Sequence, residues 1–316
     1  MKIALITDTH FGARNDSEVF NNYFFKFYDN VFFPYLKEHN IKHCIHLGDI
    51  TDRRKFINFK TLDKFRHDFV YKLGRYDVDT HVIIGNHDTY YKNTNEINSM
   101  NTLFTSFDGK YEPYIYTKAT EVDFDGCKML FLPWICDDNL EQSFRAIKES
   151  KSTVCMGHLE LNGFEAHPGH VMERGMDHSV FKKFKKVFTG HYHSKSHKDN
   201  IYYLGNPYQL YWNDFGCKRG FHVFDTTTLK TTHYRNPFDV FVKLYYNNGI
   251  SLPSEREVEG TFVKLIVEDK GDYAKFDYAV KRLQDMNIAD LKIVEDLSVG
   301  HNDVDILETE DTLTLL

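Results

Sequence analysis

Short apolar runs alternate with longer amphipathic stretches along the first part of the chain. Each short run is rich in β-branched residues and ends at Gly or Asp, which predicts a buried strand. Between the first three runs, residues 19–38 and 60–73 carry apolar side chains at helical spacing. Strand and helix therefore alternate, as in α/β layers. The predicted strands are residues 3–6, 41–47, 81–84, 153–156 and 187–189.

Further strands are predicted in the middle of the chain, including a late hairpin, which together favour two sheets packed as a sandwich and flanked by helices. These strands are residues 127–133, 202–204, 220–224 and 231–234. After residue 236 a strand, strand, helix, strand pattern predicts a small α+β domain. The expected domains are thus residues 1–236 and 237–297, followed by an acidic tail over 298–316 that has no Lys or Arg.

Composition narrows the class of protein. Among the 316 residues, 41% are hydrophobic and 16% aromatic, as in ordinary globular proteins. No apolar run approaches membrane-spanning length, and the first apolar run is too short for a signal peptide. The lack of a long apolar run also argues against a membrane partner. The five cysteines are widely spaced and include no Cys-x-x-Cys pair, which argues against a disulfide framework and a thiolate zinc site and favours a cytoplasmic protein. The net charge of −7 leaves a nucleic-acid partner undecided.

Polar clusters follow the five predicted strands, where open α/β sheets place their sites. Any one cluster is also typical of a tight turn, but five in this order favour one shared site. His, Asp and Asn supply donors that suit manganese, iron or zinc, and two such ions favour phosphoester cleavage. The clusters are Asp8-x-His10, Gly48-Asp49-x-x-Asp52, Gly85-Asn86-His87-Asp88, Gly157-His158 and Gly190-His191-x-His193.

This series resembles the calcineurin-like metallophosphoesterase pattern, and within it the SbcD-type nucleases of double-strand-break repair, in their T-even-phage branch. Phe11-Gly12 after His10 is similar to the nucleases, because phosphoprotein phosphatases place Gly directly after that His. Leu132-Pro133-Trp134 and Leu204-Gly205-Asn206-Pro207 are also similar. The resemblance covers residues 1–236 well. It implies a two-sheet β-sandwich flanked by helices, with a small C-terminal α+β cap domain.

The resemblance also implies a site for two divalent metal ions, with manganese expected. One ion is expected on Asp8, His10, Asp49 and His193, and the second on Asp49, Asn86, His158 and His191. His87 is the expected general acid. Asp52 stands where cellular relatives usually carry a second His, and its carboxylate is expected to hydrogen-bond His87. Asp88 and Glu160 are expected to orient ligating histidines, and the expected DNA or phosphate contacts are Arg53, Arg54, Lys55 and Lys92.

The implied function is a manganese-dependent DNA exonuclease and single-strand endonuclease subunit. Its implied partners are DNA, an SbcC-like coiled-coil ATPase and a second copy of the chain, paired through helices at 60–73 and 95–107. The host cytoplasm is the expected location if the protein is phage-encoded. Because the chain stops after the acidic tail, the ATPase dock is expected to be missing or truncated. The alternatives are a phosphoprotein or small-molecule phosphatase and a non-catalytic, metal-stabilised interaction module.

Overall fold

The computed structural model describes residues 1–104 and 112–295. The predicted acidic tail lies outside the described residues, as does the end of the predicted helix at 95–107. The described chain forms two compact units. The larger comprises Met1–Leu210 and Cys217–Phe238, and the smaller comprises Tyr211–Gly216 and the residues from Asp239 onward. No helix among the described residues is both long enough and apolar enough to cross a bilayer.

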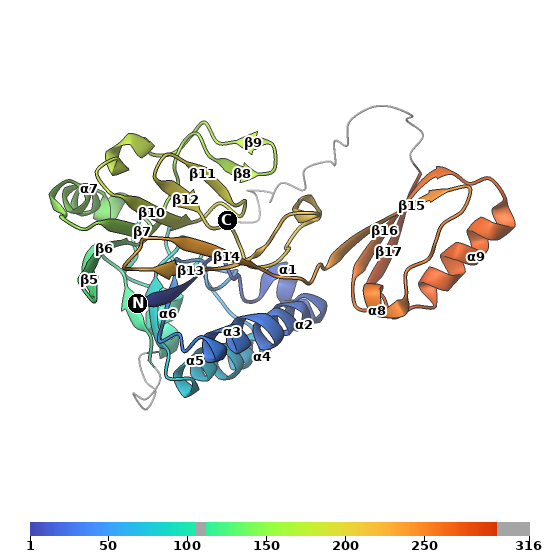
Figure 1. Ribbon diagram of the computed structural model, residues 1–316, viewed down its shortest axis with the longest axis horizontal. Coiled ribbons are helices and arrows are strands. Elements are labelled where there is room, and N and C mark those ends of the chain that lie inside the picture. Colours follow the sequence, from blue (N-terminus) through green and yellow to red (C-terminus); the bar gives the residue numbers. More distant parts are fainter. Residues whose placement is uncertain (105–111, 296–316) are drawn as a thin grey trace. The chain divides into compact units, whose positions relative to one another are not determined.

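Two six-stranded sheets form the larger unit (Figure 1). In the first sheet four strands are parallel, and the predicted late hairpin adds two antiparallel strands at the edge beside β1. Its order is β14 (Thr231–Arg235), β13 (Gly220–Asp225), β1 (Lys2–Ile6), β2 (His43–His46), β3 (Asp79–Ile83) and β4 (Tyr114–Tyr116). The expected strands are therefore confirmed, with boundaries that move by one or two residues.

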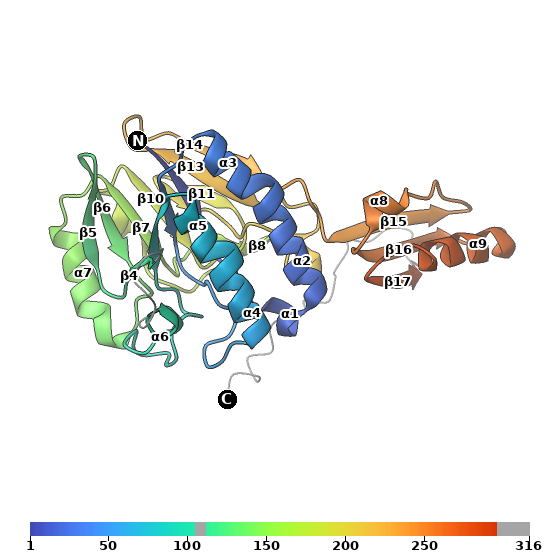
Figure 2. The same cartoon turned by 90° about the horizontal axis from the view of Figure 1, so that it is seen from below.

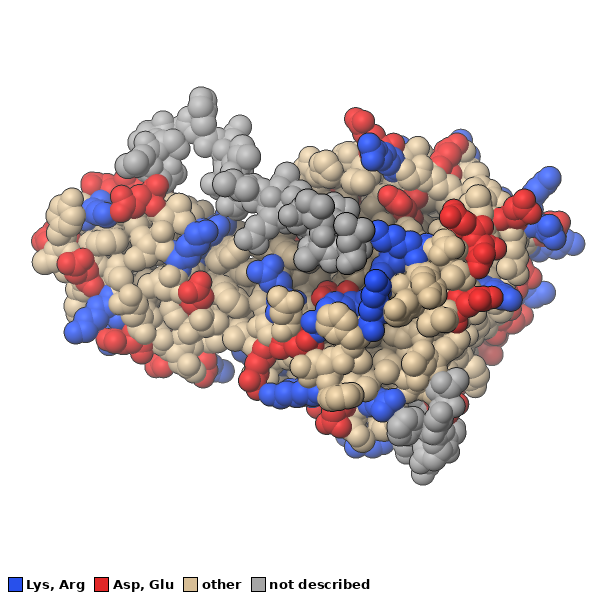
Figure 3. Space-filling model, turned by 180° about the vertical axis from the view of Figure 1, so that it is seen from behind, with Lys and Arg blue, Asp and Glu red and all other residues tan. Residues whose placement is uncertain are grey.

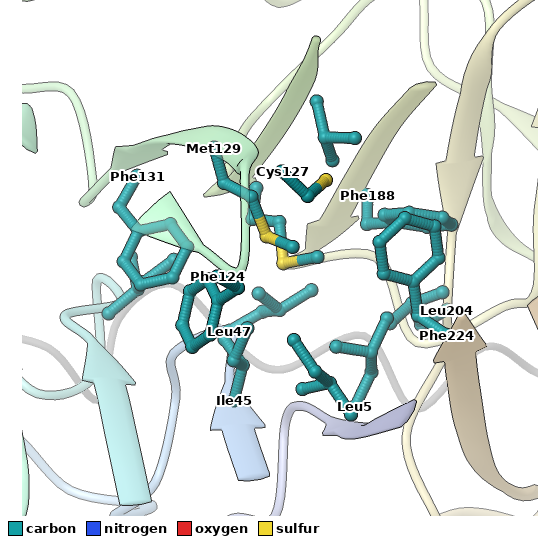
Figure 4. Packing of buried hydrophobic residues seen from close by; sticks show 14 residues of the cluster. Leu5, Ile45, Leu47, Phe124, Cys127, Met129, Phe131, Phe188, Leu204 and Phe224 are labelled. Carbon is teal, nitrogen blue, oxygen red and sulfur yellow. The ribbon is translucent and has the colours of Figure 1, made fainter. Parts of the chain in front are cut away.

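The second sheet has a parallel centre and antiparallel edges. Its order is β11 (Ser196–Lys198), β12 (Ile201–Tyr203), β10 (Lys186–Gly190), β7 (Val154–His158), β6 (Cys127–Leu132) and β5 (Thr120–Phe124). The two sheets pack face to face through one apolar cluster, in which Leu5 and Ile45 of the first sheet meet Met129 and Phe188 of the second (Figure 4). Full burial of each such side chain contributes roughly 1.5–3 kcal/mol to folding.

Two long helical segments cover the outer face of the first sheet and run side by side (Figure 2). The first comprises α2 (Glu18–Phe27), a wide π-type turn (Tyr28–Phe32) and α3 (Phe33–Glu38); the second comprises α4 (Phe59–Lys64), a similar turn (Phe65–Val70) and α5 (Tyr71–Arg75). Aromatic rings join the two segments, with Tyr28 and Phe69 at a centroid distance of 4.8 Å. Both predicted helices are confirmed as α/β connections.

Each helical segment ends in the same kind of turn before the next strand. Asn40 and Asp77 adopt left-handed backbone conformations with φ of 48° and 59°. The residue after each then donates its N–H to a carbonyl five positions earlier, Ile41 to Leu36 and Val78 to Leu73. Asn and Asp tolerate this conformation better than most residues, so these positions end the helices and direct the chain into β2 and β3.

Shorter elements complete the larger unit. The segment α1 (Ala13–Asp16) is a left-handed turn, because three of its residues have positive φ. Next come α6 (Ser99–Phe104), and a 3₁₀ turn (Asp137–Asn139) that leads into α7 (Leu140–Glu149). Residues 163–177 contain a small hairpin of β8 (Glu165–His167) and β9 (His170–Val171), followed by a 3₁₀ turn at His178–Phe181.

The smaller unit has a parallel three-stranded sheet with the order β15 (Phe241–Asn247), β16 (Phe262–Asp269) and β17 (Asp290–Glu295). Helices α8 (Glu255–Val258) and α9 (Tyr273–Gln284) connect these strands, and Asp272 caps α9 by accepting the N–H of Ala274. Apolar side chains of α9 cover the sheet. The 3₁₀ turn Trp212–Asp214 joins this unit because the Trp212 ring packs on Phe241 at 4.6 Å.

Candidate metal centre

The candidate site is built from the loops that follow β1, β2, β3, β7 and β10. These strands are parallel within their sheets, so their carboxyl ends share an edge. The first two loops run together beyond the sheet, because Asp8 and His10 donate their backbone N–H groups to the carbonyls of Gly48 and Asp49 at 3.0 and 3.1 Å. Side chains far apart in the sequence are thereby held next to each other.

Glycines let these loops approach more closely than a side chain would allow. A Cβ on Gly85 would lie 2.3 Å from the backbone N and the carboxylate Oδ1 of Asp49. A Cβ on Gly48 would lie 2.5 Å from Nδ1 of His158. The strand-end glycines therefore serve packing around the candidate ligands.

One group of donors comprises Asp8, His10 and His193. Asp8 is fully buried and His10 is 3% exposed. The Nε2 atoms of His10 and His193 face each other at 3.1 Å. Asp8 accepts the backbone N–H of His191 and the hydroxyl of Thr7, which fixes its carboxylate at the end of β1.

The second group comprises Asp49, His158 and His191, and Asn86 lies among them. Oδ1 of Asn86 is 3.0 Å from Nε2 of His158 and 2.9 Å from Nδ1 of His191. His158 donates its Nδ1–H to the carbonyl of Leu47 at 2.7 Å, which turns Nε2 toward the other donors.

Asp49 belongs to the second group and also lies close to the first. Its Oδ2 atom is 3.2 Å from Nε2 of His158 and 3.9 Å from Nε2 of His10. Its other oxygen accepts the backbone N–H of His87 at 2.8 Å. A carboxylate so placed can contribute to both groups. All seven ligands expected from the sequence therefore occur in one connected cluster.

The electrostatics of this cluster favour bound cations. Burial alone would raise the pKa of Asp49, but the charges of His158, His87 and His10 outweigh it and hold the pKa well below its usual range. Burial raises the pKa of Asp8 to about 6 despite the opposing charge of His158. Burial would lower the pKa of His158, yet Asp49 and Asp8 raise it to about 9. Buried and half-buried imidazole, carboxylate and amide donors thus converge around Asp8 and Asp49, a set that fits divalent manganese, iron or zinc.

The backbone at several donors is strained. Asp8, His10, Asp49 and His191 have φ values of 51°, 44°, 53° and 88°. Such left-handed conformations are uncommon for residues other than Gly and often occur where function requires a particular side-chain direction. Here they turn side chains inward at the point where each strand ends.

His87 and Asp52 are adjacent, but their contact differs from the expected one. Nδ1 of His87 donates to the backbone carbonyl of Asp52 at 2.6 Å, while the Asp52 carboxylate lies 3.3 Å from Nδ1 of His10. The expected bond between the Asp52 carboxylate and His87 is therefore wrong. The first two loops run side by side, which brings the Asp52 side chain to His10 and leaves only its carbonyl facing His87.

Asp88 was expected to orient a ligating histidine, but its observed contacts are different. Asp88 is fully buried, and its carboxylate accepts the backbone N–H groups of Ile50, Thr51 and Gly85. It therefore joins the second and third loops through their main chains and contacts no ligating imidazole among the described residues. For Glu160, likewise, no side-chain bond to a candidate ligand occurs in the described part of the chain.

The four expected phosphate contacts have different surroundings. Arg53 pairs with Asp16, and its guanidinium lies 4.6 Å from the Phe56 ring centroid. Arg54 is half-buried, and its Nη1 atom has no hydrogen-bond partner among the residues that the structure describes. Lys55 and Lys92 are exposed. Although the net charge is negative, Lys and Arg side chains gather on one face of the larger unit (Figure 3).

Two residues lie at the site although the sequence predicted no role for His46 and placed Trp134 only in a motif shared with the family. His46, buried in β2, accepts the N–H of Gly48 at Nδ1 and bonds the Thr9 hydroxyl through Nε2 at 3.0 Å, so it joins the first two loops. Trp134 lies beside the second group, with its ring 5.1 Å from that of His191. The available signal for His46 was a histidine that follows the apolar pair Cys44-Ile45 within a buried strand. For Trp134 the signal was its place directly after a strand.

Known proteins resemble this chain. A profile of the calcineurin-like phosphoesterase family matches residues 1–195. The chain is 30% identical over 318 aligned residues to exonuclease subunit 1 of Enterobacteria phage T4, an alignment that covers 100% of this chain and 91% of that protein.

Solved structures show weaker likeness. An archaeal phosphodiesterase is 15% identical with a TM-score of 0.39, over 75% of this chain and all of that one. GAP50, described as the anchor in the inner membrane complex of Plasmodium, is 12% identical with a TM-score of 0.45, over 76% of this chain and 90% of that one.

Proposed function

Because the chain belongs to the calcineurin-like phosphoesterase family and is a metal-dependent phosphodiesterase of its phage nuclease branch, we propose that it is a manganese-dependent DNA exonuclease and single-strand endonuclease. The observation that carries this proposal is the position of Asp49 between two buried donor groups, with His87 beside it. The exonuclease similarity over the whole chain supports DNA as the substrate.

In this proposal one ion is held by Asp8, His10, Asp49 and His193. The second is held by Asn86, His158 and His191 together with Asp49. When bound, such ions supply Lewis-acid activation of the phosphoryl group and lower the pKa of a nearby water.

His87 is the proposed general acid. Its Nδ1–H is held by the carbonyl of Asp52, so the proton that it transfers is carried on Nε2. The backbone N–H of His87 bonds Oδ1 of Asp49, which fixes the imidazole loop next to the donor cluster. Protonation of the leaving 3′-oxygen by His87 completes cleavage. The Asp52 carboxylate acts on His10, whose orientation it stabilises.

We also propose partners of the enzyme. The T4 relative is an exonuclease subunit, which supports a complex with an SbcC-like coiled-coil ATPase in recombination or double-strand-break repair. We propose a homodimer through the helices at 60–73 and 95–107, whose described parts lie together because the Phe65 and Phe104 rings pack at 5.9 Å. Sedimentation should show a dimer, and a concentration-independent monomer would contradict it. Binding to the ATPase with and without residues 298–316 tests the role of the tail.

One parallel assay tests the activity. Purified protein with manganese is offered end-labelled blunt duplex DNA, single-stranded circular DNA and p-nitrophenyl phosphate. A nuclease degrades both DNA substrates and turns over the monoester poorly. A phosphatase gives the reverse pattern, and an inert interaction module gives neither activity despite bound metal.

A further inference from the structure

Two loops next to the candidate metal centre carry exposed aromatic rings. Phe56 lies in the loop after β2 and is 63% exposed, and Tyr90 and Tyr91 lie in the loop after β3 and are 38% and 49% exposed. Single exposed aromatics are common, but three on adjoining loops beside a catalytic cluster form an unusual surface. We name these three residues the ring platform.

The loop that carries the two tyrosines is held firmly. Tyr90 donates its N–H to the carbonyl of Ile97, and Thr89 pairs with Asn98 in an antiparallel bridge, so residues 88–98 form a small hairpin. The Asn95 side chain anchors this hairpin by donating to the carbonyl of Trp134 at 2.8 Å. The rings are thus exposed on an ordered support. Little conformational entropy is lost when a ligand packs on them.

Basic groups lie beside the rings. Lys55 lies 5.8 Å from the Tyr90 ring centroid and connects the two loops. Lys92 follows Tyr91 directly and is exposed. Arg53 covers Phe56. Acidic side chains also border the rings: Asp16 pairs with Arg53, Glu96 lies in the hairpin, and the N–H of Asp138 bonds the carbonyl of Asn93. Aromatic faces alternating with cations are typical of surfaces that bind single-stranded nucleic acid.

The platform also lies within reach of the reacting groups. Tyr90 follows His87 by three positions, so their Cα atoms are at most about 10 Å apart, the rise of about three stacked nucleotides. The Asp52 carbonyl that holds His87 is likewise three positions before Lys55. Bases that precede or follow the scissile phosphate can therefore reach the rings.

On the premise of the proposed DNA nuclease activity, we propose that Phe56, Tyr90 and Tyr91 stack on unpaired bases and give the enzyme its preference for single-stranded or frayed DNA. The interleaved lysines favour a polyanion over a second copy of this chain, because a protein interface of this kind would have fewer charges at its centre. Stacking requires bases, whereas attraction to phosphates does not. This difference makes the proposal testable.

The test compares binding of two fluorescent oligonucleotides of equal length, a single-stranded oligo-dT and an abasic phosphodiester chain, with calcium present instead of manganese. Phe56→Ala and Tyr91→Ala should each weaken oligo-dT binding about tenfold, as expected for one lost stacking contact. Binding of the abasic chain should stay unchanged. Tyr91→Phe should bind as the parent protein does, because it keeps the ring. Tyr278→Ala, at a site on α9 that is 64% exposed, is the matched control.

Three results would overturn the inference. The alanine variants could lose affinity equally for both oligonucleotides, they could lose affinity for neither, or they could sediment as monomers where the parent protein sediments as a dimer. The last result would assign the rings to a contact between copies. Hydrolysis of bis-p-nitrophenyl phosphate with manganese is measured beside these assays. If the parent protein does not hydrolyse this substrate, the proposed function is contradicted. If it does hydrolyse the substrate but binds both oligonucleotides in the same way in every variant, only the role of the ring platform is contradicted.

Discussion

At the scale of single residues, the candidate site depends on side chains placed by unfavourable backbone conformations. His10 and His191 have positive φ, a conformation that is uncommon for residues other than Gly. Each such residue costs about 1–3 kcal/mol, which the rest of the fold must offset. In return, these backbone conformations set the direction of the imidazole side chains. Nε2 of His10 faces Nε2 of His193, and Nδ1 of His191 faces Asn86.

His87 provides the most direct test of the chemistry. In His87→Asn the imidazole is lost while every proposed metal ligand remains. Cleavage of DNA should fall by about 100-fold or more, as expected for loss of a general acid, while the metal content measured by elemental analysis stays the same. An unchanged cleavage rate would remove the general-acid role.

His46 should matter for stability and for metal affinity. His46→Leu leaves the N–H of Gly48 without its buried partner and the Thr9 hydroxyl with only the carbonyl of Ile50, so the free energy of unfolding should fall by about 2 kcal/mol or more. Metal titration should show weaker binding, since both loops carry proposed ligands. His43→Leu, at the half-buried start of the same strand, is the control. Unaltered metal affinity in His46→Leu would contradict this positioning role.

His81 should make folding sensitive to acid. Burial, with a contribution from His43, lowers the pKa of His81 to about 4 in the folded protein, against 6.5 for an ordinary histidine. The unfolded chain therefore binds a proton first, and the stability contribution is present above pH 6.5 and lost as pH falls toward 4. Between pH 7 and 5 this loss amounts to about 2 kcal/mol.

The measurement is the free energy of unfolding as a function of pH. His81→Gln should flatten that dependence relative to the parent protein. His170→Gln, at an exposed position in β9, should not. Equal slopes for all three proteins would show that His81 does not contribute.

At the scale of elements, the site is a set of interlocked strand-end loops. Asp88 joins the second and third loops through backbone N–H groups, His46 joins the first and second, and His158 bonds the end of β2 at Leu47. The loops therefore support one another, and a change in one should displace donors carried by another.

Gly85 tests this dependence. Gly85→Ala places a Cβ 2.3 Å from Asp49, so Asp49 must move away from its position between the two donor groups. Bound metal and DNA cleavage should both fall at least tenfold while circular dichroism shows a folded protein. Gly169→Ala, where the glycine has φ of 76° with open space around it, controls for general backbone strain. Full metal occupancy in Gly85→Ala would contradict the argument.

At the scale of the whole molecule, the larger unit has the sandwich core and all of the proposed ligands, while the smaller unit has its own apolar cluster beneath α9. A ligand that binds only the folded larger unit should stabilise that unit alone. We therefore expect that metal binding does not change the stability of the smaller unit.

Calorimetry checks this expectation. Manganese at 100 times its Kd adds about 2.7 kcal/mol to the folded state of the larger unit, which corresponds to a rise in Tm of about 5–10 °C. A second transition, from the smaller unit, should not move on addition of manganese or of chelator. Asp49→Asn should lose most of the shift. One transition that moves as a whole would indicate that the two units unfold together.

The amino-acid sequence by itself determined the layered fold and the grouping of five polar clusters at one site, and the family resemblance implied which of their residues are ligands. Strand and helix periodicities are local, and parallel strands bring their carboxyl ends to one edge whatever the details of packing. Residues as distant as Asp8 and His193 could therefore be assigned to one site, and the helices at α2–α3 and α4–α5 could be located.

Only the tertiary structure decided how the individual side chains are paired. The Asp52 carboxylate contacts His10, Asp88 bonds backbone amides, and His46 connects two loops, because these contacts depend on the separation and twist of loops that the sequence pattern does not encode. The same holds for the ring platform. Phe56 and Tyr90 lie on adjoining loops because residues 52 and 87 are hydrogen-bonded, a contact between positions that are far apart along the chain.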